Sequence, residues 1–262
     1  QKLEHLIVQD LFLTETATYA DVILPASAWP EKDGTVTNTN RQIQMGRKAL
    51  NLPGDAKEDW WITNEIGKRI GLNWNYNHPK DIFDEMKEAM PSLNNISWER
   101  LEKENSVTYP CNSPDSEGEE IVFGEKFPTA DGKGKFVYAS VIPPDEVPDD
   151  QFPMILTTGR QLEHWHTGAM TRRASNLNAI EPEATICLSP EDIVNNKIEP
   201  GDLIKISTKR GSINIRVRED RSIPQGVIFL PFCYNEAAAN LLTNSALDPF
   251  GKIPEFKYCA AN

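Results

Sequence analysis

The sequence predicts an α/β segment, part of a Rossmann-like domain, followed by a β-barrel domain. Two short apolar runs, residues 5–8 and 22–24, flank a short helical pattern at 14–20, which is the order of an α/β crossover. Residues 105–152 are rich in Pro, Gly, Ser and Asp, as is typical of a linker or a surface loop. After them the apolar pattern changes to short strands, which indicates a compact β-barrel.

The first part, residues 1–105, continues with helices after its crossover. A helix is predicted from the N-cap Asp59 to Ile70, and Gly71 ends it. Residues 81–90 form a second amphipathic pattern, and residues 97–103 form a third. This part is therefore expected to be rich in helices.

The second and third parts are residues 106–150 and 151–262. We expect the linker to end in a solvated acidic stretch at 145–150. A helix starts at Ser189-Pro190, with serine as the cap and proline in the first turn. Arg210-Gly211 is a hairpin turn signal between two of the predicted strands. These strands are residues 154–157, 202–208, 212–218 and 227–230.

Composition excludes several classes of function. The chain of 262 residues has 39 acidic against 27 basic residues, a net charge of −12, which argues against non-specific nucleic-acid binding and docking to membrane surfaces. No apolar stretch approaches the roughly 20 residues of a membrane span. No targeting segment is visible, so a cytoplasmic protein is expected. Because a strand pattern begins almost at once, we expect a part of a longer polypeptide. The four cysteines lie far apart and are expected to be buried thiols.

The most informative stretch is residues 157–173, a basic island in an acidic chain. It carries three arginines and one glutamate, a local charge of +2, which favours an anionic ligand such as a polyphosphate. Glycine at 159 permits close approach of a ligand, and Arg160 can donate two bonds to phosphate. If this stretch is extended, His164 and His166 share one face and can donate to an anion or a heterocycle. The alternative is a pair of polar loop histidines around a core tryptophan.

Other residues carry weaker signals. Two histidines without a third ligand are not expected to bind a metal. Asn240, in a short helix rich in small residues, can read a ring edge, or it is simply a helix-terminal asparagine. Lys257 likewise can bind a ligand, or it is an ordinary surface lysine. Gln9 and Asp10 stand at the carboxyl end of a predicted strand, where ligands of α/β sheets gather. No nucleophile signature, phosphate-binding loop or dinucleotide fingerprint is present, so no catalytic residue is expected in this chain.

Several motifs together resemble the molybdopterin oxidoreductases of the dimethyl-sulfoxide-reductase type. They span nearly the whole chain in the expected order: residues 20–25, 31–35, 158–168, 170–173 and 248–257. Within this family the chain resembles in particular the catalytic α subunit of molybdenum- or tungsten-dependent formate dehydrogenase, on residues 109–111, 125–127 and 252–259. Nitrate reductase of the same family shares most of the cofactor motif and is the alternative.

The resemblance implies a bis(molybdopterin guanine dinucleotide) cofactor with Mo or W. It implies that one stretch lines the cofactor, namely Thr158, Gly159, Arg160, Gln161, Leu162, Glu163, His164, Trp165, His166 and Thr167. Asn240 and Lys257 would hold the pterin side, and Phe232 would lie near the substrate approach. The other guanine dinucleotide would contact Gln9, Asp10, Lys32 and Asp59. The fold implied for residues 151–262 is a double-psi β-barrel.

The chain also departs from the family pattern. It contains neither the cysteine cluster for an iron–sulfur centre nor the cysteine or selenocysteine that ligates the metal. We therefore expect the C-terminal portion of a catalytic subunit, inactive alone, whose partners are the rest of its own subunit and electron-transfer subunits carrying iron–sulfur, flavin or NAD centres. The alternatives are a cofactor-binding module without redox activity, or an unrelated double-psi barrel of a chaperone or decarboxylase type.

Overall fold

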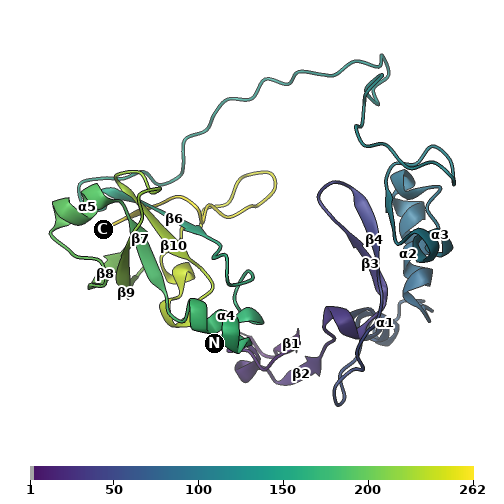
Figure 1. The fold of residues 1–262 in the computed structure, drawn as a ribbon, viewed down its shortest axis with the longest axis horizontal. Helices are drawn as coiled ribbons and strands as arrows, with labels where there is room; N and C mark the ends of the chain where they lie inside the picture. The colour runs from purple at the N-terminus through teal and green to yellow at the C-terminus, as the bar shows by residue number, and fades with distance from the viewer. Residues whose placement is uncertain (1–2) are drawn as a thin grey trace. The chain divides into compact units, whose positions relative to one another are not determined.

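The computed structural model describes residues 3–262, and the chain divides into two compact units, Gln1–Val137 and Tyr138–Asn262 (Figure 1). Each unit has its own hydrophobic core. No helix within residues 3–262 has the length and apolar character needed to cross a membrane.

Unit 1 begins with two parallel strands, β1 (Ile7–Asp10) and β2 (Val22–Pro25), joined by a short 3-10 helix at Ala17–Tyr19. The crossover predicted from sequence is thus present, although its helix is a single 3-10 turn. Because the strands are parallel, with Asp10 opposite Pro25, their carboxyl ends lie side by side. Polar side chains at the end of β1 are therefore placed at one edge of this small sheet.

A three-stranded antiparallel sheet of unit 1 was not predicted from sequence. It comprises β3 (Gly34–Thr37), β4 (Gln42–Gly46) and β5 (Ser106–Thr108), with β4 in the centre. The β3–β4 turn contains Arg41 in the left-handed region, with φ of 66°. The Arg41 guanidinium donates to the carbonyl oxygens of Tyr109, Glu119 and Glu120, which fastens the start of the linker to this hairpin.

The three predicted helices of unit 1 are confirmed. They are α1 (Asp59–Arg69), α2 (Pro79–Ala89) and α3 (Trp98–Glu104), with 3-10 turns at Trp29–Glu31 and Pro91–Leu93. Side-chain caps fix two of the starts, because His78 accepts a bond from the backbone of Lys80 and Ser97 accepts one from Arg100. The core between the helices and the sheet consists of Ile43, Phe83, Leu93, Ile96, Trp98, Leu101, Val107 and Cys111.

Unit 2 is built on a curled, six-stranded mixed sheet in the order β11-β6-β10-β7-β9-β8. The neighbouring strands β6 and β10 are parallel to each other. The two edge strands meet, because the backbones of Ser207 and Asn262 exchange two hydrogen bonds of 2.7 and 2.9 Å. The strands are β6 (Met154–Gly159), β7 (Thr185–Leu188), β8 (Leu203–Ser207), β9 (Ser212–Glu219), β10 (Val227–Pro231) and β11 (Cys259–Ala261).

Alternation of side chains explains why these strands enclose a core. In β9, Ile213, Ile215 and Val217 are buried while their neighbours are exposed or half-buried, the period-two pattern of a strand with one face inside. The remaining helices are α4 (Ser175–Ile180), α5 (Pro190–Asn196) and 3-10 turns at Thr171–Arg173, Asn235–Ala237 and Ala239–Leu241. Ser189 caps α5 as predicted, accepting a bond of 3.1 Å from the Asp192 backbone.

The predicted linker has no helix or strand between β5 and β6 (Figure 1). The expectation that its acidic end is solvated is wrong for Glu146. Its carboxylate bonds to the Arg210 guanidinium and accepts a bond of 2.9 Å from the Ala260 backbone, and only 9% of its side chain is exposed. The linker is thus fastened to unit 2 through a partly buried charge pair.

Candidate functional site

Strand β6 delivers the predicted ligand-binding motif at its carboxyl end. Thr158 and Gly159 are buried in the strand, and Arg160 follows at its exposed end. A Cβ atom at Gly159 would lie 2.3 Å from the Phe229 ring on the neighbouring strand β10, so no larger residue fits here. The close packing of β6 against β10 therefore sets where the chain leaves the sheet and presents Arg160.

The predicted residue Lys257 lies against this strand end. Its ammonium nitrogen donates to the Thr158 carbonyl oxygen over 2.9 Å, and the Thr158 hydroxyl donates to the Phe256 carbonyl oxygen over 3.0 Å. These two bonds join residues almost one hundred positions apart in sequence. Lys257 is consequently not an isolated surface lysine.

A pocket of about 400 Å³ lies beside this junction in unit 2. Six residues predicted to bind the cofactor line it together with Phe232, which was predicted near the substrate approach: Thr158, Arg160, His166, Thr167, Asn240 and Lys257. The other lining residues were not predicted individually: Thr243, Asn244, Pro254 and Phe256. The lining contains two permanent cations, Arg160 and Lys257, and no carboxylate. Within residues 3–262 the Arg160 guanidinium and the Asn240 amide have no hydrogen-bond partner, so both can serve a ligand.

The two histidines do not share one face, so the interpretation of an extended segment is wrong. Residues 160–166 form bends instead of a strand, and His166 has a left-handed backbone with φ of 51°. His166 is exposed at the pocket, where its ring packs edge-on against Phe232 with 5.3 Å between ring centres. His164 is only 2% exposed and does not line the pocket.

His164 instead anchors the loop inside unit 2. One ring nitrogen lies 2.7 Å from the Glu181 carbonyl oxygen and the other 3.4 Å from the Thr171 hydroxyl. The Tyr234 hydroxyl donates to the same carbonyl oxygen, and its ring meets His164 edge-on at 5.6 Å. Burial raises the pKa of Tyr234. The Arg172 guanidinium lies over the Tyr234 ring, 4.7 Å from its centre. Contacts among His164, Tyr234 and Arg172 thus hold the loop in place.

The remaining residues of the predicted stretch lie outside the pocket. Leu162 is 95% exposed and Trp165 is 65% exposed. The Gln161 amide donates to the Glu163 carboxylate over 3.1 Å. Among the lining residues that were not predicted individually, Phe256 directly precedes the predicted residue Lys257. Its position next to Lys257 was the one sequence signal that could have placed it at the pocket.

A second cluster of predicted residues lies in unit 1. The Asp59 carboxylate at the start of α1 accepts bonds from Gln9 and Ser27, both of 3.0 Å, and from the Lys32 ammonium. Burial alone would raise the pKa of Asp59, but the bonds from Lys32, Ser27 and Gln9 outweigh it and lower the pKa. Asp10 stands apart, because its carboxylate accepts a bond of 2.6 Å from the Leu11 backbone.

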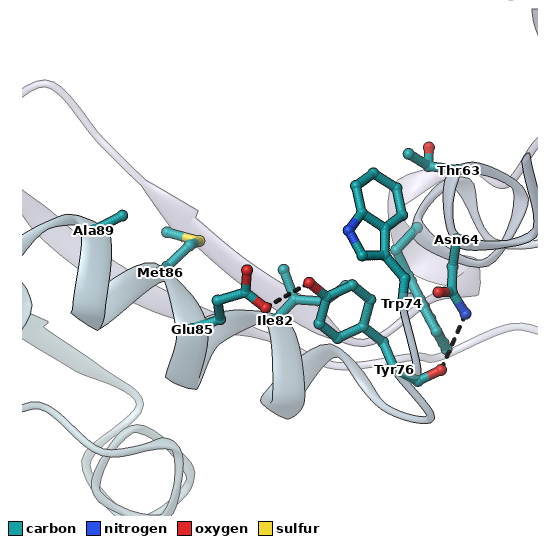
Figure 2. Close-up of a pocket in the computed structure, with 9 residues that line it drawn as sticks. Thr63, Asn64, Trp74, Tyr76, Ile82, Glu85, Met86 and Ala89 are labelled. Atoms are coloured by element: carbon teal, nitrogen blue, oxygen red, sulfur yellow. Dashed lines mark hydrogen bonds between the residues drawn. The ribbon is translucent and has the colours of Figure 1, made fainter. Parts of the chain in front are cut away.

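Unit 1 also has an aromatic pocket of about 440 Å³ between α1 and α2 that sequence reasoning missed (Figure 2). The stretch between the two helices that carries Trp74 and Tyr76 forms one wall. The Tyr76 hydroxyl bonds to the Glu85 carboxylate, and the Asn64 amide donates to the Tyr76 carbonyl oxygen over 3.1 Å (Figure 2). Its lining is mainly aromatic and aliphatic and contains no cation, unlike the lining of the cationic pocket in unit 2.

Neither pocket presents a nucleophile or a metal centre. All four cysteines are buried and free, and burial raises the pKa values of Cys187, Cys233 and Cys259, which keeps these thiols protonated. Within residues 3–262 no three His, Cys, Asp or Glu side chains gather as a metal site would require. The side chains of the unit 2 pocket can bind and orient an anion.

Comparison with known proteins identifies the family. Residues 154–260 match the model of the molydopterin dinucleotide binding domain, and residues 1–69 match the model of molybdopterin oxidoreductase. The cationic pocket falls in the first of these regions, and the Asp59 cluster falls in the second.

Curated relatives include alpha subunits of F420-dependent formate dehydrogenases. The chain is 45% identical over 99% of its length to that of Methanocaldococcus jannaschii, and 41% identical over its full length to one from Methanococcus maripaludis. It spans 39% of the length of each.

Among solved structures, acetylene hydratase from Pelobacter acetylenicus has the same fold. The TM-score is 0.74 at 19% identity, and the match covers 99% of this chain and 40% of that one. The two family models and the relatives agree, and the chain belongs to the molybdopterin oxidoreductase family.

Proposed function

We propose that the unit 2 pocket binds a molybdopterin guanine dinucleotide in the catalytic subunit of a formate dehydrogenase. The observation that carries the proposal is the pocket itself, with two cations, no carboxylate, and a guanidinium that has no partner within residues 3–262. The matched dinucleotide binding domain and the formate dehydrogenase relatives support it.

The donor set fits this group. A pyrophosphate requires positive charge and several donors, which Arg160 and Lys257 provide. Guanine and pterin rings present adjacent donors and acceptors, which suit the Asn240 amide because it offers both. The ring of Phe232 supplies an apolar surface beside His166.

Each residue then has a defined task. Arg160 donates to phosphate oxygens, and the Lys257 ammonium contributes charge while it stays bonded to the strand end. Asn240 reads a ring edge, and His166 donates to the ligand. Thr158, Arg160, His166 and Thr167 line the pocket, His164 holds their loop from inside the unit, and Phe232 borders the substrate approach.

A second dinucleotide is assigned to the Asp59 cluster of unit 1. Gln9 and Lys32 bond to Asp59 and form a preorganised polar group near the carboxyl ends of two parallel strands, where ligands of such sheets bind. Asp10, which follows Gln9 in the sequence and has no bond to this cluster, is assigned to the same dinucleotide. Two such dinucleotides constitute the bis form of the cofactor, with Mo or W as the metal.

The finer fold assignment belongs to the same proposal. Residues 1–105 are assigned to a Rossmann-like domain, 106–150 to a linker, and 151–262 to a double-psi β-barrel. The parallel pair β1–β2 supports the first, and the meeting of Ser207 with Asn262 supports closure of the last.

In the whole subunit the proposed reaction is oxidation of formate to carbon dioxide, in which a C–H bond breaks and two electrons and one proton leave. When bound, the cofactor supplies the redox chemistry, and this chain supplies binding and orientation. The proposed partners are the rest of the subunit and electron-transfer subunits with iron–sulfur, flavin or NAD centres, in the cytoplasm.

The test is made in the full-length subunit, by measuring the pterin and guanine nucleotide released per protein on denaturation. Arg160→Met removes charge-assisted hydrogen bonds, and retention under dilution should fall roughly tenfold or more. Arg221→Met is the matched control, because the side chain of Arg221 is 89% exposed and lies outside the pocket. Equal retention in the two variants would overturn the cofactor assignment.

The substrate assignment has its own assay. Formate-dependent dye reduction by the full-length subunit is expected, and nitrate reduction without formate oxidation would contradict it. Cofactor retention without any redox turnover would identify a binding module.

A further inference from the structure

Residues 136–142, here called the apolar segment, contain the least buried apolar side chains of the linker. Phe136 is 103% exposed, Tyr138 is 90% exposed and Val141 is 97% exposed, and Val137 and Ile142 are about three-quarters exposed. Within residues 3–262, the backbone of residues 135–144 forms no hydrogen bond and adopts no helix or strand (Figure 1). The sequence Phe-Val-Tyr-Ala-Ser-Val-Ile nevertheless consists mainly of residues that favour strands.

Both faces of the apolar segment are largely apolar. In an extended chain, successive side chains point to opposite faces, so Phe136, Tyr138 and Ile142 share one face with Ser140, while Val137 and Val141 share the other with Ala139. A strand with one solvated face would alternate apolar and polar residues, whereas apolar residues on both faces are typical of a strand covered on both faces. The pattern thus differs from that of β9, which has one exposed face.

The flanking residues set the limits of this strand. Lys133 and Lys135 precede it, and Pro143 and Pro144 end it because proline cannot donate to a strand ladder. An open strand with bare apolar faces is a template for aggregation, so a stable protein must cover it. Seven extended residues are long enough for a full strand of a sheet.

We propose that the apolar segment is an interior strand of a sheet contributed by the portion of the subunit that this chain does not span. The segment lies between the two regions that match family models. The chain spans 39% of the length of its relative from Methanocaldococcus jannaschii, so most of the residues of such a subunit that could pack against the segment lie in that portion. This inference is independent of which ligand the unit 2 pocket binds.

The experiment compares this chain with the full-length subunit by amide hydrogen exchange over residues 135–142. Exchange should be close to the unprotected rate in this chain and at least roughly 100-fold slower in the full-length subunit. Fast exchange in both proteins would overturn the proposal. Protection that appears in this chain alone and grows with its concentration would overturn it in favour of a second copy, and protection that requires a separate subunit would overturn it too.

Proline substitutions test the strand directly. The amides of adjacent residues point to opposite sides, so Val137→Pro and Tyr138→Pro should both abolish protection of the full-length subunit if strands lie on both sides. Ala130→Pro is the control, because Ala130 is the second residue of a turn closed by the Gly132 amide on the Thr129 carbonyl, where proline is favoured.

Side-chain access covers the case in which the proline variants do not fold. Val137→Cys and Tyr138→Cys present one thiol on each face, and the four natural cysteines are buried and give a low background. Both thiols should react with a maleimide at least roughly 100-fold more slowly in the full-length subunit than in this chain. Blocking of only one thiol would show a strand with one free face and would contradict an interior position.

Discussion

The Lys257 ammonium donates to the Thr158 carbonyl oxygen over 2.9 Å, so a residue two positions before the last strand holds the end of strand β6. The Thr158 hydroxyl returns a bond of 3.0 Å to the backbone next to Lys257. One cation therefore both fixes the floor of the unit 2 pocket and contributes to its charge.

Replacing Lys257 separates these roles. Lys257→Met keeps the apolar stem but removes the charge and the bond to Thr158, and cofactor retention by the full-length subunit should fall about tenfold. Lys257→Arg should recover part of it, since the charge returns with a different shape. The measurement is nucleotide released per protein, with Lys209→Met as the control because Lys209 does not line the pocket. Equal losses in both variants would contradict the assignment.

Substitutions of His164 and His166 are expected to have different effects on stability and on cofactor binding. His164→Ala leaves the Glu181 carbonyl oxygen with one partner fewer and opens space beside Tyr234, and the free energy of unfolding should fall by about 2–4 kcal/mol. His166→Ala, at the exposed pocket wall, should change stability by less than about 0.5 kcal/mol but weaken cofactor retention. Urea unfolding of each variant checks the first expectation. A reversed order of stabilities would contradict the positions described.

Gly67 in α1 tests the packing of the aromatic pocket. A Cβ there would lie 2.2 Å from the Trp74 ring, so Gly67→Ala should cost about 1–3 kcal/mol even though alanine favours helices. Trp74 fluorescence should change as its ring moves. At Gly34 a Cβ would meet nothing within 4 Å, and Gly34→Ala is the control, expected to stay within about 0.5 kcal/mol.

Glu146 makes the attachment of the linker dependent on pH. The hydrogen bond from Arg210 lowers the pKa of Glu146 in the folded protein, against the opposing effect of burial. A lowered folded pKa means that the pair stabilises the protein above the ordinary value of 4.5, and that this stability is lost as the pH falls below it.

The matching variant is Glu146→Gln. At neutral pH it should be less stable than the natural protein by about 1–2 kcal/mol, and the two should converge in acid. Unfolding curves between pH 7 and pH 3 measure the difference. A gap that stayed constant through this range would show that the carboxylate charge is not involved.

Sequence reasoning succeeded where side-chain period and turn chemistry agree. The alternation in Ser212–Glu219 and the Arg210-Gly211 turn predicted a hairpin that the structure contains. It failed for the β3–β4 hairpin, whose turn depends on Arg41 in a left-handed conformation that arginine rarely adopts. The strand β11 is three residues long, too short for any period to show.

The sequence predicted several of the residues that line the unit 2 pocket, but only part of their arrangement. Arg160, Asn240 and Lys257 do meet at one pocket, although 97 positions separate the first from the last. The position of His164 could not be read from spacing, because the left-handed backbone at His166 turns the chain and sends the two rings to different surroundings. Thr243 and Asn244 carry no pattern of their own and reach the pocket through the tertiary fold.

The contact between Ser207 and Asn262 bears on the behaviour of the purified chain. Where two edge strands pair with each other, they leave fewer free amides for a foreign strand to join. Aggregation of this chain in solution should therefore start at the linker and should not involve the sheet of unit 2. A charged residue placed at Val141 would then improve solubility, whereas the same change on the rim of the sheet would do little.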